Sequence, residues 1–245
     1  MVIAIAVAFT ACKEPELELE PEPEHEPEHV HKWEWITIRP ATCAAIGLEV
    51  GVCKLDASHT TIRVIALLAH TIAGTYRCSV CNNPYELGDT GPGGGKIFYR
   101  IETGFTMTDD NTTAYYLEAA PTDRATALTW ASEDYYSTDI ADTEEAIGTG
   151  RKNTALILVM DVDAPAAKAC NEYRNGSKTD WFLPSKDELN QLYENRTSVG
   201  NMGTSMYWSS SQSSNHHACF QRFSDGNKYN YHKFNIFSVR PVRAF

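Results

Sequence analysis

Basic residues are scarce in this chain of 245 residues. It contains 21 lysines and arginines against 32 aspartates and glutamates, which gives a formal net charge of -11. A nucleic-acid partner normally requires a basic face, so the charge argues against DNA or RNA as a partner. Much of the acidity lies in one short tract at residues 13–31 and therefore says little about the folded part.

The chain also lacks a long apolar run at its start. Only residues 1–11 are apolar, whereas a transmembrane helix needs about 20 such residues. The small residues Thr10 and Ala11 directly before Cys12 resemble a bacterial lipobox, in which the cysteine is acylated after cleavage of the signal. No Lys or Arg precedes the run, although a signal peptide normally has one. We expect residues 1–12 to direct export and Cys12 to anchor the protein by lipid to the outer surface of the bacterial envelope; the alternative is a buried apolar segment.

Two parts are expected before the main domain. Residues 13–31 alternate Glu with Pro, Leu and His, and like-charge repulsion together with proline predicts an extended, solvated tether. Residues 32–87 are expected to form a small β-rich repeat unit, which begins with the alternating strand pattern of residues 33–38. A shorter partial repeat of this pattern, with Thr71 and Gly74, follows within the same range.

The cysteines of the small unit leave several interpretations open. The unit contains Cys43, Cys53, Cys78 and Cys81 and resembles short cysteine-containing β repeats of bacterial surface proteins. Paired Cys-x-x-Cys knuckles indicate zinc, but the first such spacing here is Cys53-x-x-Asp56. Disulfides, free buried thiols and a structural ion all fit the sequence, and we predict no metal ligands.

Residues 88–245 form the main predicted domain. Strand-like stretches at 96–100 and 115–120 come first. Helical stretches follow at 153–160, from Pro165 towards Gly176, and after Ser185, which opens a capping box with Glu188. Short strands rich in aromatic residues return at 206–210, 218–223 and 237–243. Strands, then helices, then strands within one stretch predict an α+β domain.

Motifs of several common sites are missing from this domain. The loop at 91–96 is rich in glycine, but it precedes a strand and has Ile97 where a P-loop has Ser or Thr, so we interpret it as a turn. The Glu-Pro-Asn and Trp-Asn-Asp motifs of calcium-dependent lectins do not occur, and Trp208 is followed by serines. No His-Asp pair can be assigned to Ser209, Ser210 or Ser211. We therefore predict no catalytic residues and no cofactor.

A metal site made of His216, His217, His232 and Cys219 is also disfavoured. Adjacent histidines on a strand point to opposite faces, so His216 and His217 cannot both bind one ion without distortion. The block at 180–185, Asp-Trp-Phe-Leu-Pro-Ser, runs into a capped helix and is typical of a core segment with a helix start.

Four motifs in order carry a resemblance to a known family. They are Gly-Pro-Gly-Gly-Gly-Lys-Ile-Phe-Tyr at 91–99, the block at 180–185, Tyr-Trp-Ser-Ser-Ser at 207–211 and the ending Ser-Val-Arg-Pro-Val-Arg-Ala-Phe. Residues 88–245 resemble bacterial C-type-lectin-like lipoproteins, fold relatives of the formylglycine-generating enzymes. The likeness is to the variable proteins of diversity-generating retroelements, in particular the treponemal variable protein (TvpA-like) type. It implies a C-type-lectin-like fold in which residues at about 205–245 are varied by reverse transcription that corrupts template adenines.

The resemblance makes a prediction about individual residues. Corrupted adenines of an AAY codon give NNY codons, which cannot encode Lys, Gln, Glu, Met or Trp. Across 213–219 and 229–237 only Lys233 lies outside the reachable set. Gln212, Gln221, Lys228 and Lys233 are accordingly expected to be fixed framework. The expected variable, ligand-binding positions are Ser213, Ser214, Asn215, His216, His217, Cys219, Tyr229, Asn230, Tyr231, His232, Phe234, Asn235, Ile236 and Phe237.

The implied function is binding of a protein or glycan on another cell or a host surface. Aromatic and small polar side chains on a rigid scaffold suit such a role, and the alternation at 229–232 predicts that one subset points outward if the stretch is extended. An invariant adhesin or structural lipoprotein is the alternative. An enzyme of the formylglycine-generating type is disfavoured, because it needs a cysteine pair while Cys170 lies in a predicted helix and Cys219 at a varied position, where it fits a former tyrosine codon.

Overall fold

The computed structural model describes residues 30–68, 70 and 75–245. Cys12, the tether before residue 30, Thr71 and Gly74 lie outside the described residues, so the predicted lipid anchor stays a prediction. Across the described part, no helix is both long and apolar enough to cross a membrane.

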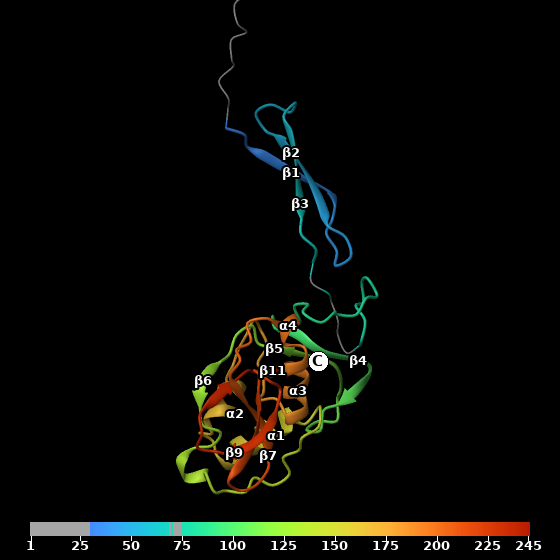
Figure 1. The fold of residues 1–245 in the computed structure, drawn as a ribbon. Coiled ribbons are helices and arrows are strands. Elements are labelled where there is room, and N and C mark those ends of the chain that lie inside the picture. The colour runs from blue at the N-terminus through green and yellow to red at the C-terminus, as the bar shows by residue number, and fades with distance from the viewer. Residues whose placement is uncertain (1–29, 69, 71–74) are drawn as a thin grey trace, which may run out of the picture.

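A small sheet of three antiparallel strands comes first and stands apart from the other elements (Figure 1). The strand predicted at 33–38 is confirmed, and it bends by a register shift between Thr37 and Arg39. Apolar side chains such as Ile36 and Ile62 are exposed on this sheet, which carries little core of its own. In order across the sheet, its strands are β1 (Trp33–Arg39), β2 (Gly47–Cys53) and β3 (Thr60–Ile65).

The main domain begins with a second three-stranded antiparallel sheet. The strands predicted at 96–100 and 115–120 are confirmed, and the first of them is longer than expected. The last residues of the chain pair with the middle strand, and Phe245 stacks on Tyr116 with ring centres 5.2 Å apart. In order across the sheet, the strands are β11 (Val242–Ala244), β5 (Thr113–Ala119) and β4 (Lys96–Thr106).

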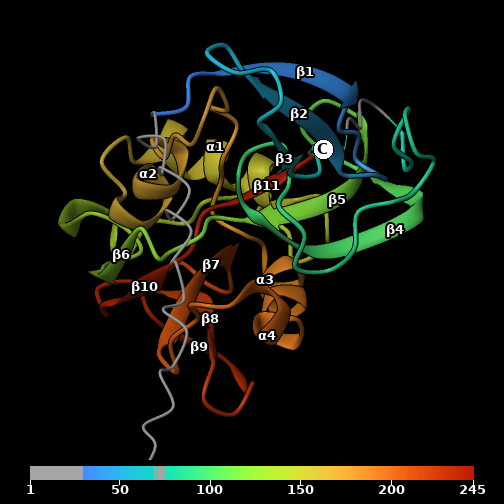
Figure 2. The same cartoon turned by 90° about the horizontal axis from the view of Figure 1, so that it is seen from above.

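A five-stranded sheet carries most of the C-terminal region. Neighbouring strands are antiparallel except for β7 and β10, which are parallel. The last strand of this sheet, β9, lies away from α1 and α2 (Figure 2). In order across the sheet, the strands are β6 (Ala125–Leu128), β10 (Phe237–Val239), β7 (Met206–Gln212), β8 (His217–Arg222) and β9 (Lys228–His232).

The single strand predicted at 237–243 is wrong. The chain forms two strands there, β10 and β11, and they belong to different sheets. Between them lies Arg240, which is buried and donates to Asp123 Oδ1 at 2.7 Å. Pro241 follows and has no N–H to donate to a strand neighbour. This anchored break lets the chain pass from one sheet to the other.

The predicted helices are present, although α1 starts three residues before the expected position. Pro165 occupies the first turn of α2, and Ser185 and Glu188 form the predicted capping box of α3, with Ser185 N donating to Glu188 Oε2 at 2.7 Å. The helices are α1 (Gly150–Met160), α2 (Pro165–Asn171), α3 (Lys186–Glu194) and α4 (Arg196–Val199), with a 3-10 turn η1 (Glu133–Tyr135) before them.

The core lies between the helices and the two sheets of the main domain. α1 packs on β7, α2 on β6 and β10, and α3 on β7 and β8. Trp130, Trp208 and the block Trp181, Phe182 and Leu183 are fully buried, as the sequence predicts for that block. The fold is thus mostly β-sheet with a few helices, and within the described residues the helices pack mainly on β6, β7, β8 and β10 of the five-stranded sheet.

Candidate ligand-binding surface

Most of the predicted ligand-binding positions lie on the β8–β9 hairpin and the loops beside it. In the hairpin, His217 lies opposite His232 and Cys219 lies opposite Asn230. Gly226 closes the turn at φ +79°, with its N–H donating to Arg222 O at 2.7 Å. Within the part of the chain that the structure describes, the outer edge of β9 pairs with no other strand.

All five residues of β9 are exposed. The alternation at 229–232 was expected to direct one subset of side chains outward. Instead, both subsets are accessible, because an edge strand has a covering neighbour on one side only. Tyr229 and Tyr231 are 43% and 48% exposed on one side of the hairpin, and Asn230 and His232 are exposed on the other.

The two tyrosines are exposed but anchored. Both contact Phe220 on β8, with ring centres 5.6 Å from Tyr229 and 6.2 Å from Tyr231. Phe220 in turn packs on Trp208 and Phe237 in the core, at 6.1 and 4.6 Å. The tyrosine rings therefore offer contact area to a ligand with little freedom left to lose on binding.

A second row of rings runs along the other side of the hairpin. The rings of His217 and His232 are 4.2 Å apart, and His232 stacks on Phe234 at 4.9 Å with an interplanar angle of 9°. Phe234 contacts Tyr136 from the loop after η1, at 5.8 Å. Partial burial and the adjacent His232 lower the pKa of His217, which favours its neutral form.

The flanking loops are held by their own backbone bonds. In the loop between β7 and β8, the N–H groups of Ser213 and Ser214 donate to His217 O at 3.0 and 3.1 Å. After β9, Asn235 N donates to His232 O at 2.9 Å. These turns present their side chains on a fixed backbone.

We call the accessible set of predicted positions the edge surface. It joins the loop before β8, the strand β9 and the loop after it into one contiguous strip. Its members, all exposed or half-buried, are Ser213, Ser214, Asn215, His216, His217, Tyr229, Asn230, Tyr231, His232, Phe234, Asn235 and Ile236.

Cys219 and Phe237 do not belong to the edge surface. Cys219 is 1% exposed, and its Sγ lies 3.9 Å from Glu145 Oε1 in the loop before α1. Burial raises the pKa of its thiol to about 11. Phe237 is 7% exposed and packs on Trp208 with ring centres 4.4 Å apart. Both side chains point inward, so neither reaches a ligand at the surface of this structure.

Lys233 is fully buried although its neighbours on both sides are exposed. Its ammonium donates to Thr138 O and to Gln212 Oε1, both at 2.6 Å, and lies 4.8 Å from the ring centre of Trp130. Gln212 Oε1 also accepts from Ile140 N at 3.1 Å. Burial lowers the pKa of Lys233 to about 8. Lys233 and Gln212 thus fasten the edge surface to the loop after η1.

Gln221 has a similar position on β8. Its buried side-chain amide donates to Asn190 Oδ1 on α3 and to Gly226 O in the hairpin turn, both at 3.0 Å. Lys228, the remaining residue expected to be fixed, is exposed at the start of β9.

The glycine-rich loop is a turn, as predicted, and it surrounds a carboxylate of the protein itself. Gly93 N and Gly95 N donate to the buried Glu118 at 2.9 and 3.0 Å. Arg243 near the end of the chain donates to Glu118 Oε1 at 2.9 Å and to Asp180 Oδ1 at 2.6 Å. A Cβ on Gly93 would lie 2.6 Å from Glu118 Oε1, which explains the glycine there. This cluster ties three of the four sequence motifs together.

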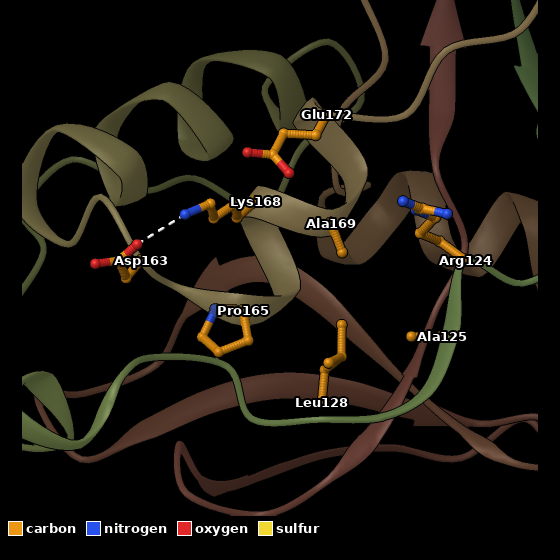
Figure 3. Close-up of a pocket in the computed structure, with 8 residues that line it drawn as sticks. All are labelled: Arg124, Ala125, Leu128, Asp163, Pro165, Lys168, Ala169 and Glu172. Atoms are coloured by element: carbon orange, nitrogen blue, oxygen red, sulfur yellow. Dashed lines mark hydrogen bonds and ion pairs between the residues drawn. The ribbon is translucent and has the colours of Figure 1, made fainter.

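A hollow of about 400 Å³ lies elsewhere, between β6 and α2 (Figure 3). It is lined by Leu128, Pro165 and the ion pair of Lys168 with Asp163, whose atoms are 2.7 Å apart. β6 and β9 are the two opposite ends of the five-stranded sheet. The hollow is therefore separate from β9, and its lysine is already paired.

Sequence reasoning missed Tyr136 and Phe220. Tyr136 extends the row of rings at Phe234, yet it lies far away along the chain and no motif marks it. Phe220 supports both tyrosines, and its place directly after Cys219, a predicted variable position on β8, was the available signal.

A family model described as the Lcl C-terminal domain matches residues 119–243, slightly more than half of the chain. The chain belongs to the Lcl C-terminal domain family. The match runs from the end of β5 to β11 and includes the whole edge surface. The small sheet and the glycine-rich loop lie outside the residues matched to the Lcl domain.

The other comparisons are sparse. No curated protein matches the chain. Among solved structures, a fimbrial protein from Bacteroides ovatus is similar at 13% sequence identity and a TM-score of 0.41. The alignment covers 82% of this chain and 57% of that chain, so this chain spans less than two thirds of the fimbrial protein.

Proposed function

We propose that the Lcl domain of this chain binds a protein or glycan through the edge surface, and that a diversity-generating retroelement varies the residues of this surface. The edge surface is the recognition face, and the remainder of the domain is a constant scaffold. Membership of the Lcl family is consistent with such a variable, lectin-like binding protein. We further propose that the domain has a C-type-lectin-like fold, supported by its two sheets, its helices and its pairing of the chain end with β5.

One observation carries the proposal. Residues that NNY codons cannot encode occupy bonded positions next to the edge surface: Gln221 and Lys233 are buried, and Gln212 is half-buried. Residues that such codons can encode make up the exposed strip around them. A mutational process restricted to those codons would change the exposed strip, together with the buried Cys219 and Phe237, and would leave the bonds of Gln212, Gln221 and Lys233 in place. Lys228 is exposed and does not contribute to this argument.

Binding is favoured over catalysis by the state of the candidate nucleophiles. Cys170 and Cys219 are buried, and burial raises the pKa of both thiols, which disfavours the reactive thiolate. Ser209 Oγ donates to Cys219 O at 2.9 Å, and Ser211 Oγ donates to the backbone at 2.7 Å. The two serines thus bond β7 to β8 and to the loop before α1.

The proposed context is the outer surface of a bacterial cell. Cys12 would carry the lipid, the Glu/Pro-rich tether would extend the chain from the membrane, and the Lcl domain would meet partners on another cell or host. The net charge of -11 makes a nucleic-acid partner unfavourable.

The genomic locus tests the diversification directly. We expect a second, near-identical copy of the codons for about residues 205–245 and a nearby reverse transcriptase gene. Mismatches between the copies should fall at template adenines and at edge-surface codons. If no such copy exists, an invariant adhesin or structural lipoprotein replaces the diversified binder.

A display experiment tests the recognition face itself. One library places NNY codons at Asn230, His232 and Asn235, and a matched library places them at Thr122, Thr126 and Ser177 on the same full chain. Selection against a panel of proteins and glycans should enrich binders from the first library only. Equal enrichment from both libraries would show that the edge surface has no special role.

A further inference from the structure

Four metal-binding side chains converge outside the Lcl domain. Cys43, His70, Cys78 and Cys81 each offer one ligand atom, and these atoms all lie within 4.8 Å of one another. Cys43 lies in the loop between β1 and β2, whereas Cys78 and Cys81 lie in the segment before β4. The sequence contains the spacing Cys78-x-x-Cys81, but the earlier stretch Cys53-x-x-Asp56 has an aspartate in place of a second cysteine and argued against a paired knuckle. The structure brings Cys43 and His70 to the knuckle instead.

Two of the distances between ligand atoms are close to those around a tetrahedral ion. Zinc at about 2.3 Å from each sulfur and about 2.0–2.1 Å from nitrogen places two sulfurs about 3.8 Å apart and a sulfur and a nitrogen about 3.6 Å apart. In the structure, Cys43 Sγ and Cys78 Sγ are 3.6 Å apart, and Cys81 Sγ and His70 Nδ1 are 3.3 Å apart. Three thiolates and one imidazole are a ligand set typical of structural zinc.

The surroundings hold these ligands in place. In the knuckle, Val80 N donates to Cys78 Sγ at 3.4 Å, and Asn82 N donates to Cys78 O at 2.9 Å. Tyr85 Oη donates to His70 O at 2.8 Å, and the edge of one ring faces the other at 5.3 Å. Such bonds outside the ligand set orient metal ligands and strengthen binding.

The accessibility of the four ligands and a comparison with a disulfide also favour a metal ion. A surface hollow of about 310 Å³ is lined by Cys43, His70 and Tyr85 and gives an ion a path to the ligands. A disulfide needs about 2.05 Å between its sulfurs, and none joins the described cysteines. A Cys43–Cys78 disulfide would use only two of the four side chains, whereas one ion would use all four.

We propose that Cys43, His70, Cys78 and Cys81 bind one zinc ion, which fastens the small sheet to the segment in front of the Lcl domain. That segment is itself fixed to the domain, because Tyr76 stacks on Tyr116 of β5 at 5.4 Å. The ion therefore fixes the position of the small sheet relative to the Lcl domain. It gives a sheet with little core the cross-link that small units commonly need.

Metal content of the full chain tests the site. Chain purified under reducing conditions with zinc present should contain about one zinc per chain. His70→Ala and Cys78→Ser should each weaken zinc binding by more than about 100-fold, since loss of a partner outside the ligand set already costs about 10–100-fold. Cys170→Ala removes a buried thiol in the core and is the matched control, which should retain the zinc. Iron in place of zinc, or unchanged zinc content in Cys78→Ser, overturns the proposal.

Three further measurements keep the test independent of variant folding. Cobalt added to the metal-free wild-type chain should give thiolate-to-cobalt charge-transfer bands and the intense visible bands of a tetrahedral site. A chelator should speed proteolytic separation of the small sheet from the Lcl domain while the domain itself stays intact. The protein should also be isolated from the cells that produce it naturally and analysed by mass spectrometry. A Cys43–Cys78 disulfide in that protein would contradict the zinc site.

Discussion

Two populations of side chains alternate within the short region from Gln212 to Phe237. The edge surface carries exposed groups such as Asn230 and Ile236. The framework carries the buried Gln221, Lys233 and Phe237 and the half-buried Gln212, each bonded to or packed on another element. Residues that are adjacent in the sequence thus differ in burial and in the number of bonds and packing contacts that a substitution would remove.

The difference shows how one strand region can be both constant and changeable. A buried polar group must keep its hydrogen bonds, since an unsatisfied one costs about 1–3 kcal/mol. A buried ring must keep its volume. An exposed side chain on an edge strand has neither constraint. Position in the sheet, rather than position in the sequence, therefore decides which residues tolerate change.

The adjacent residues Ile236 and Phe237 give the sharpest contrast. Phe237→Ala removes a ring packed on Trp208 and Phe220, and we expect the free energy of unfolding to fall by about 3–5 kcal/mol. Ile236→Ala removes a side chain that is 61% exposed, and we expect a change within about 0.5 kcal/mol. Urea denaturation of both variants measures the difference. Equal losses would mean that the buried and exposed populations do not exist as described.

Cys219 and Asn230 make the same comparison across a strand pair. They lie opposite each other on β8 and β9, but Cys219 is buried and Asn230 is exposed. We expect Cys219→Tyr to cost about 1–3 kcal/mol, because the larger ring overpacks the space beside Glu145. Asn230→Tyr should change stability by less than about 0.5 kcal/mol.

Thermal and urea unfolding of this pair also tests the codon argument. Cys219 fits a codon that once specified tyrosine, which requires the site to accept that residue. If Cys219→Tyr is as stable as Asn230→Tyr, position 219 accepts a tyrosine and belongs to the edge surface. A clear loss of stability would place it with the framework.

Features set by local chemistry were predictable from sequence. The capping box at Ser185 and the turn of the glycine-rich loop depend on residues within a few positions of one another. The burial of Trp181 and Phe182 follows from an apolar block that runs into a helix. Such features need no knowledge of distant partners.

Features set by distant partners were not predictable in the same way. The break between β10 and β11 depends on Arg240 reaching Asp123, a partner that lies 117 residues earlier in the chain. The exposure of both sides of β9 depends on its place at the end of the sheet. The meeting of Cys43 and His70 with the knuckle needs the small sheet to be folded first. In each case the deciding neighbour lies far along the chain.

The pH dependence of stability gives a finer test of Lys233 as framework. Burial lowers the pKa of Lys233 to about 8 in the folded chain, against 10.5 as the ordinary value. Between about pH 8 and pH 10.5 the unfolded chain therefore holds a proton at this residue that the folded chain has lost. Unfolding then takes up a proton, so the contribution of Lys233 to the free energy of unfolding rises with pH in this window.

The measurement is the difference in unfolding free energy between wild type and Lys233→Met, followed from pH 7 to pH 10.5. We expect this difference to shift in favour of wild type as the pH rises, because the neutral amine keeps its bonds to Thr138 and Gln212 without the cost of a buried charge. Lys228→Met removes an exposed lysine of the same region and should follow the wild-type curve. If the difference in unfolding free energy between wild type and Lys233→Met does not change with pH, Lys233 is solvated. It would then not belong to the framework, and the edge surface would extend across position 233.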